Sequence, residues 1–245
     1  MSMLKRKRLV LFDLDGTLIN SAPDIADAVD AALLQQNFPA VGERRVRRYI
    51  GSGVSSLIHK ALTRSVEKKA PVKEHQAVYQ FFLDYYHTNV FKKSEIYPHA
   101  EELLRHLKKI GWIVACVTNK PSVFTTRVLA KAQLAKYFDC VLSADSPSDQ
   151  KPRPALLLQA MARYKIPAND TLMVGDSIND IEAAVRAGVK SIAVNFGYNG
   201  GRDLLKYGAS SRINSLDQLQ FIIDDITESY SIQEHFEATF GKPST

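Results

Sequence analysis

Two acidic side chains near the start of the chain have the spacing of a cation-assisted catalytic site. Asp13 and Asp15 follow the apolar run Leu9–Phe12, and Gly16 and Thr17 come directly after them. Carboxylates this close repel each other and favour a nearby cation. Taken alone, however, Asp-x-Asp-Gly is more often a strand-ending turn in which Asp caps and Gly supplies a positive φ. Partners elsewhere in the chain must decide between these interpretations.

Two later segments supply polar groups of the kind that bind phosphate. Thr118 and Asn119 follow the apolar run Trp112–Val117, and a hydroxyl and an amide can donate hydrogen bonds to phosphate oxygens. Lys151 stands before Pro152, and an ammonium held near the acids would neutralise both them and a bound phosphate. Each has an ordinary alternative, a helix-entry turn for Thr-Asn and a surface position for the lysine.

A third acid follows another apolar run. Thr171–Val174 is followed by Gly175 and Asp176, and a helical pattern begins at Ile178. By itself Asp176 is compatible with a helix N-cap, and the nearby Asp180 with a helix-surface acid. Three separate strands that each end in a required group make coincidence a poor explanation, since the carboxyl ends of parallel strands meet at one sheet edge.

These groups predict phosphoryl transfer. Carboxylate oxygens suit a hard cation, and Mg²⁺ commonly takes a few carboxylates together with water and substrate phosphate oxygens. With its charge balanced, Asp13 can attack phosphorus and form an aspartyl-phosphate. Asp15 can then protonate the leaving oxygen and later activate water.

The elements that position these residues alternate between strand and helix from residue 96 onward. Alternation of this kind predicts right-handed βαβ units and a parallel sheet, hence an α/β fold. The predicted strands are 9–12, 112–118, 139–144, 171–174, 191–194 and 210–213, and the predicted helices are 100–110, 123–134, 155–164 and 178–187.

The segment between the first strand and this alternating region has only helical periodicity. Residues 22–92 place apolar side chains at helical spacing, and about 70 residues are too many for a simple connection. We therefore expect a helical cap at 21–94, a catalytic core at 1–20 and 95–228, and a polar C-terminal tail at 229–245. Hinges are expected near 20–22 and 94–98, where polar residues and Pro interrupt the pattern.

Composition narrows the class of protein. The chain has 245 residues, of which 45% are hydrophobic and 24% are charged, with a net charge of +6. The basic run Lys5–Arg8 is not interleaved with aromatic residues and leads into the first strand, which favours a solvated surface over nucleic-acid binding. Cys116 and Cys140 lie in apolar runs, as expected of buried thiols in a reducing compartment. Without a signal or a membrane-spanning stretch, we expect a cytoplasmic protein with no membrane partner.

The motifs together resemble those of the haloacid dehalogenase (HAD) superfamily phosphatases, and more closely the phosphoglycolate phosphatases. The resemblance covers nearly the whole chain, and the four motifs occur in order: Asp13-Leu14-Asp15-Gly16-Thr17, Thr118-Asn119, Lys151-Pro152, and Gly175-Asp176 with Asn179-Asp180. It is supported by Tyr49-Ile50-Gly51-Ser52-Gly53 within the cap and by Phe196-Gly197-Tyr198-Asn199.

The resemblance implies a Rossmann-like, doubly wound parallel sheet with an inserted helical cap. It implies Asp13 as nucleophile, Asp15 as acid and base, and Lys151 as charge stabiliser. Thr118 and Asn119 would bind phosphate. Magnesium would be held by Asp13, the backbone carbonyl of Asp15, and Asp176.

The sequence specifies the substrate and the function of the cap less closely than it specifies the reaction. Gly51 and Gly53 either reach into the site and contact the leaving group or form a simple turn between helices. A closing cap favours a small phosphorylated metabolite, with 2-phosphoglycolate first by resemblance. A nucleotidase, a pyrophosphatase, a sugar phosphatase or phosphomutase, and a phospho-accepting regulatory module remain alternatives. Both a monomer and a homodimer are compatible with the sequence.

Overall fold

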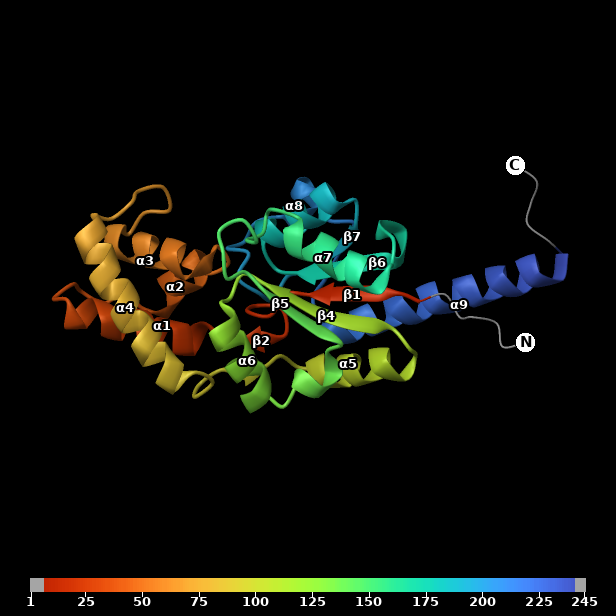
Figure 1. Cartoon of the computed structure of the whole chain (residues 1–245), viewed down its shortest axis with the longest axis horizontal. Coiled ribbons are helices and arrows are strands. Elements are labelled where there is room, and N and C mark those ends of the chain that lie inside the picture. The colour runs from red at the N-terminus through yellow and green to blue at the C-terminus, as the bar shows by residue number, and fades with distance from the viewer. Residues whose placement is uncertain (1–6, 241–245) are drawn as a thin grey trace.

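The computed structural model describes residues 7–240, with side chains through residue 228, and contains the predicted parallel sheet. Within these residues, the sheet has six parallel strands in the order β5-β4-β1-β6-β7-β8 (Figure 1). They are β1 Leu9–Phe12, β4 Ile113–Thr118, β5 Cys140–Ser143, β6 Thr171–Gly175, β7 Lys190–Val194 and β8 Ser211–Ile213. Since β1 lies between β4 and β6, its end is flanked by theirs.

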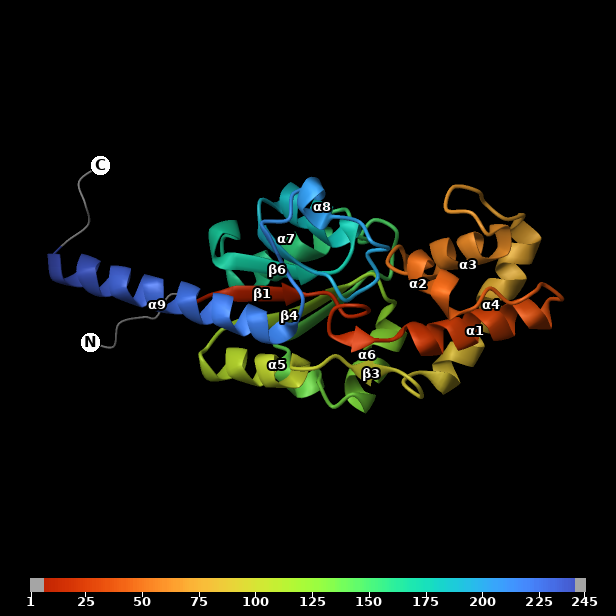
Figure 2. The same ribbon diagram turned by 180° about the vertical axis from the view of Figure 1, so that it is seen from behind.

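Helices cover both faces of this sheet because successive strand side chains point to opposite sides. Val10 and Phe12 are buried against one layer, and Leu9 and Leu11 are buried against the other. The first layer contains α5 (Ala100–Lys109), α6 (Ser122–Lys131) and α9 (Leu216–Phe240), and the second contains α7 (Ala155–Tyr164) and α8 (Ile178–Ala187) (Figures 1 and 2). Short helices connect the elements at η1 Ala135–Tyr137, η2 Ala168–Asp170 and η3 Leu204–Tyr207. This arrangement confirms the doubly wound α/β fold.

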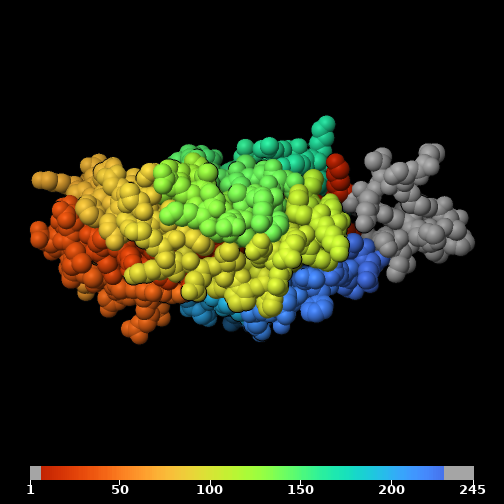
Figure 3. Space-filling view, turned by 90° about the horizontal axis from the view of Figure 1, so that it is seen from below, coloured from red at the N-terminus to blue at the C-terminus, as the bar shows by residue number. Residues whose placement is uncertain are grey.

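The inserted segment folds as a helical cap, also as predicted. It consists of α1 (Ala22–Gln35), α2 (Glu43–Tyr49), α3 (Gly53–Thr63) and α4 (Val72–Asn89). Its helices bury apolar side chains in the same continuous cluster that extends into the core. Figure 3 shows the cap, coloured red-orange to yellow, abutting the green part of the core on the face seen from below.

Two short strands connect the cap to the core. β2 (Ile19–Asn20) and β3 (Glu95–Ile96) pair antiparallel, an element that the sequence pattern did not predict. Beside them the buried carboxylate of Asp24 accepts hydrogen bonds from the backbone N–H groups of residues 92–94, at 2.8–3.0 Å. The two connections are thereby held together. Hinge motion here, and the domain limits at 20/21 and 94/95, stay predictions.

The C-terminal part of the described chain is helical. α9 was not predicted, and its C-terminal half extends beyond the core (Figures 1 and 2). Its first turns bury Leu216, Leu219 and Ile223 against the sheet. Of the segment expected as a tail, 229–240 belongs to α9, and 241–245 lies outside the described residues.

The remaining compositional expectations concern the basic run, the cysteines and the membrane. Lys5 and Arg6 lie outside the described residues, whereas Arg8 is buried with its guanidinium carbon 5.5 Å from the Trp112 ring centroid. Cys116 and Cys140 are free and buried, as expected. Among residues 7–240, none of the helices has the length and apolar character needed to cross a bilayer.

Candidate active site

The carboxyl ends of the central strands bring the predicted site residues together. Asp13 follows β1 and donates its backbone N–H to the Val174 carbonyl of β6 at 3.0 Å. Thr118 is the last residue of β4, and Asp176 follows the last residue of β6. Because β1 pairs with both strands, the three side chains belong to one edge, as the sequence predicted.

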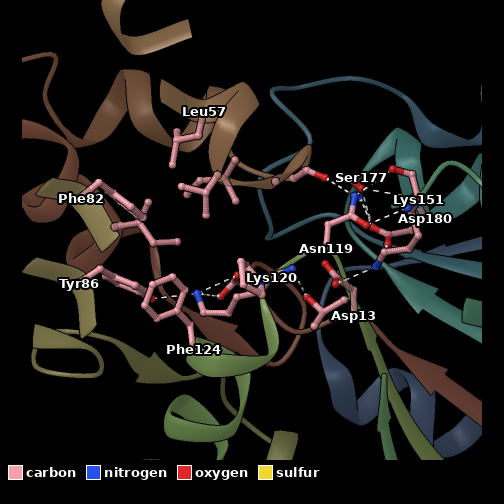
Figure 4. A pocket seen from close by; sticks show the side chains of 18 residues that line it. Asp13, Leu57, Phe82, Tyr86, Asn119, Lys120, Phe124, Lys151, Ser177 and Asp180 are labelled. Carbon is pink, nitrogen blue, oxygen red and sulfur yellow. Dashed lines mark hydrogen bonds and ion pairs between the residues drawn. The ribbon is translucent and has the colours of Figure 1, made fainter. Parts of the chain in front are cut away.

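Lys151 reaches this edge from the loop before α7 and is the central cation. Its Nζ donates to Asp13 Oδ1 at 2.8 Å, to Asp180 Oδ1 at 2.6 Å and to the Val117 carbonyl at 2.7 Å (Figure 4). The side chain is 2% exposed, so all three contacts lie away from bulk water. The ordinary expectation of a surface lysine is therefore wrong for this residue.

For each member of this ion pair, burial and the charge of its partner shift the pKa in opposite directions. Burial raises the pKa of Asp13 to about 6, although Lys151 lowers it. Burial also lowers the pKa of Lys151, but Asp13 and Asp180 outweigh that effect and raise it above its ordinary value. At neutral pH the lysine is therefore charged and Asp13 is largely ionised, which is the form that can act as a nucleophile.

A cluster of buried acids adjoins this ion pair. Asp13, Asp176 and Asp180 bring one oxygen each to within 4.8 Å of one another. Asp176 accepts from the Thr17 hydroxyl at 3.1 Å and from the Tyr198 backbone N–H at 2.6 Å. Burial, Asp13 and Asp180 raise the pKa of Asp176 well above its usual value. More carboxylate charge is gathered here than Lys151 balances, and a hard divalent cation fits such a donor set.

Asp15 belongs to a different interaction. Its two oxygens each accept from Lys120 Nζ at 3.1 Å, and the same ammonium donates to the Tyr86 hydroxyl of cap helix α4 at 2.8 Å. Burial lowers the pKa of Lys120, but Asp15 and Tyr86 raise it overall, and burial raises the pKa of Tyr86 to about 12. The Asp15 side chain therefore faces Lys120, and the expectation that this residue would bind a metal through its backbone carbonyl stays a prediction.

The two predicted phosphate-binding residues differ in which hydrogen-bonding groups they can offer to a phosphate. The Thr118 hydroxyl accepts the Lys120 backbone N–H at 3.2 Å, and the residue lines the cavity. Asn119 Nδ2 donates to the carbonyls of Lys151 and Gly51, both at 2.9 Å, while its Oδ1 accepts the Lys151 N–H at 2.8 Å. With both N–H groups engaged, Asn119 has only its backbone N–H to offer a phosphate.

The cap glycines lie where the loop between α2 and α3 meets the core. The Gly51 carbonyl also accepts from Asn179 Nδ2 at 2.8 Å. A Cβ at Gly53 would lie 2.7 Å from Gln150 Nε2 of the core. Both glycines have positive φ, 109° and 78°, which other residues rarely adopt. The loop is therefore more than a turn between helices, because it is docked on the catalytic edge.

The docked cap and the core form a small, partly open cavity of about 50 Å³ beside these groups. On the core side, acids and lysines form its wall, and on the cap side the wall is mainly apolar (Figure 4). Besides Gly51 and Gly53, its residues include Asp13, Asp15, Thr118, Asn119, Lys120, Lys151 and Asp180 from the core, and Ile25, Ile50, Val54, Leu57, Phe82 and Tyr86 from the cap.

The sequence patterns assigned no role to Lys120, Tyr86 or Asn179, and they left Asp180 as a possible surface acid. Asp180 is instead fully buried, where it caps α8 through Ser177 and binds Lys151. A signal for Lys120 was available, because it follows Thr118 and Asn119 in the same loop. Tyr86 carried no such signal, since its orientation depends on how the cap packs.

Comparisons with known proteins agree with this geometry. The haloacid dehalogenase-like hydrolase family matches residues 10–194. A protein of Nitrosococcus oceani named phosphoglycolate phosphatase is 37% identical over 90% of this chain and 98% of its own, and one of Vibrio parahaemolyticus with the same name is 38% identical over 88% and 96%.

Solved structures give the same result. The crystal structure of a predicted phosphoglycolate phosphatase from Haemophilus somnus superimposes with a TM-score of 0.82 at 32% identity, covering 91% of this chain and all of that one. The family match spans most of the sequence and includes all the site residues from Asp13 to Asp180. The chain therefore belongs to the haloacid dehalogenase-like hydrolases.

Proposed function

We propose that this chain is a Mg²⁺-dependent phosphoric monoester hydrolase that converts 2-phosphoglycolate to glycolate and phosphate through an aspartyl-phosphate. The observation that carries the proposal is the buried Lys151 bridge between Asp13 and Asp180, next to Asp176 and at the base of the cavity under the cap. It combines an ionised nucleophile with fixed positive charge at a largely buried site, and both favour phosphoryl transfer to a carboxylate.

In the first step, an oxygen of Asp13 forms a bond to phosphorus as the bond from phosphorus to the ester oxygen breaks. The leaving oxygen takes its proton from Asp15, whose carboxyl lines the cavity and is held by Lys120. The Lys151 ammonium stabilises the charge on the transferring group, assisted by the Thr118 hydroxyl.

In the second step, water attacks phosphorus and the bond to Asp13 breaks, which regenerates its carboxylate. Asp15 accepts the proton from that water, so the two steps return the site to its starting state. Asp13, Asp176 and the Asp15 backbone carbonyl would hold Mg²⁺, which supplies Lewis acidity and offsets the repulsion between carboxylates and phosphate.

Cavity size and relatives support the substrate. A space of about 50 Å³ has room for a leaving group of a few heavy atoms, and a nucleoside would extend out of it. The Nitrosococcus and Vibrio relatives are named for phosphoglycolate. These two arguments favour 2-phosphoglycolate over nucleotides and sugar phosphates, which the same core could otherwise hydrolyse.

The test is phosphate release from a panel of phosphoesters with Mg²⁺ and with chelator. The panel contains 2-phosphoglycolate, a nucleoside monophosphate, a hexose phosphate and pyrophosphate, each tested with the wild-type protein and the Asp13→Asn variant. We expect 2-phosphoglycolate to have the highest kcat/KM, with activity lost in chelator and in the variant.

Other outcomes would assign the function differently. A different preferred ester would keep the chemistry and reject the substrate. Phosphorylated Asp13 that accumulates without phosphate release would instead indicate a phospho-accepting regulatory module. Release that persists in Asp13→Asn would reject the mechanism itself.

A further inference from the structure

Two core side chains donate hydrogen bonds to one backbone carbonyl of the cap loop. Gly51 O accepts one hydrogen bond from Asn119 and one from Asn179, at 2.9 and 2.8 Å. Asn119 follows β4 and Asn179 lies in the first turn of α8, so two separate elements of the catalytic edge converge on one atom. A carbonyl oxygen has two lone pairs, and both are used.

The two amides differ in their other contacts. Asn179 additionally donates to Ser52 Oγ at 3.3 Å, so its side-chain contacts are with the cap loop. Asn119 instead holds Lys151, accepting its backbone N–H at 2.8 Å and donating to its carbonyl at 2.9 Å. One amide therefore contacts the docked loop and the backbone of the catalytic lysine at the same time.

This arrangement has a consequence for the lysine. The Lys151 ammonium must lie between Asp13 and Asp180, and its backbone position determines whether the side chain reaches them. Asn119 is 5% exposed, and loss of its side chain would leave the Lys151 backbone groups without these partners in a nearly dry environment.

We propose that Asn119 and Asn179 are positioning residues that hold the cap loop, residues 50–53, against the core through the Gly51 carbonyl, and that Asn119 couples this docking to the placement of Lys151. Asn179 acts only on closure. Asn119 acts on closure and on the catalytic charge. Neither side chain is a ligand of the phosphate in this assignment.

The kinetic test compares Asn179→Ala with Asn119→Ala, and it rests on the proposed function. Asn179→Ala should raise KM for 2-phosphoglycolate by about 3- to 10-fold with kcat little changed, as expected for loss of one or two hydrogen bonds. Asn119→Ala should also lower kcat, by about 100-fold, because Lys151 loses its support. Asn195→Ala serves as the control, since this exposed amide bonds only to Asn214 Oδ1 among the contacts described.

A second substrate separates loss of docking from general damage. p-Nitrophenyl phosphate needs more room under the cap than 2-phosphoglycolate does. In Asn179→Ala its kcat/KM should rise relative to that of 2-phosphoglycolate, whereas a merely destabilised enzyme loses both in parallel. A parallel loss in Asn179→Ala would overturn the docking role, and an Asn119→Ala variant with only KM affected would overturn the coupling to Lys151.

A distance measurement without substrate tests the docking independently of any activity. Spin labels at Leu34→Cys in the cap and Val185→Cys in the core occupy positions that are 59% and 54% exposed, while the native thiols are buried. Asn179→Ala should broaden the label–label distance distribution, and Asn195→Ala should not. An unchanged distribution in Asn179→Ala would refute the docking role. If instead the wild type releases no phosphate but the distribution broadens, the proposed function fails and the docking role holds.

Discussion

Replacement of Lys151 by methionine removes one charge while keeping a side chain of similar length. In the structure that charge has three buried partners, Asp13 and Asp180 at 2.8 and 2.6 Å and the Val117 carbonyl at 2.7 Å. Loss of preorganised positive charge at a transferring group lowers kcat by about 100- to 1,000-fold. Removal of one member of a buried ion pair costs about 3–5 kcal/mol of unfolding free energy.

The stability effect should depend on metal. Without Mg²⁺ the acids near residue 151 have no compensating cation in Lys151→Met, and with saturating Mg²⁺ a bound ion compensates them. We therefore expect Mg²⁺ to raise the unfolding free energy more in the variant than in the wild type. Urea unfolding in chelator and in Mg²⁺ gives these differences, and steady-state phosphate release gives kcat.

A matched control is Lys190→Met, at an exposed position at the start of β7. It should leave both kcat and the response to Mg²⁺ unchanged. If Lys151→Met retains more than about a tenth of wild-type kcat, or is as stable as the wild type in chelator, the electrostatic role assigned to this lysine is incorrect.

Three further predictions concern the cap loop, pH and Lys120. Gly53→Ala should raise KM by about 2- to 3-fold, because its Cβ would lie 2.7 Å from Gln150 Nε2, the end of a flexible side chain that must turn away. Gly42→Ala, with a similar φ and nothing within 4 Å, should lose only stability, and equal KM values for the two variants would contradict docking. A pKa of about 6 for Asp13, raised from 3.8, contributes stability that is present at low pH and lost as pH rises through 6. In chelator, the wild type should therefore gain about 1 kcal/mol over Asp13→Asn between pH 7 and pH 5 in urea unfolding, and no gain would refute the shift. Lys120→Met should lower kcat by about 10- to 100-fold in steady-state assays, because the acid–base carboxylate loses its orientation, and an unchanged kcat would reject that function.

The parallel sheet and its acidic edge were predictable because they depend on local patterns. Apolar runs ending in Asp13 and Asp176 indicate strand ends, and parallel topology then brings such ends together without knowledge of packing. Lys151 was likewise placed correctly at this edge by resemblance, although its burial was not apparent from its Pro-rich neighbourhood.

Other parts depend on packing that no local pattern specifies. Tyr86 meets Lys120 only because four cap helices pack at particular angles over the core. The Asn119 side chain carries the same atoms whether it binds phosphate or the Lys151 backbone, and only the fold shows the second arrangement. α9 did have a signal, since Leu216, Leu219 and Ile223 recur at helical spacing, but the polar residues that follow obscured it.

The most direct test of the central claim is phosphate release from 2-phosphoglycolate by the wild type and by Asp13→Asn, measured side by side in Mg²⁺ with mass spectrometry of the quenched protein. We predict turnover by the wild type with a transient phosphoryl group on Asp13, and a loss of about 1,000-fold or more in the variant, whose amide cannot attack phosphorus. Turnover by Asp13→Asn near the wild-type rate, or a phosphoryl group on another residue, would contradict the mechanism.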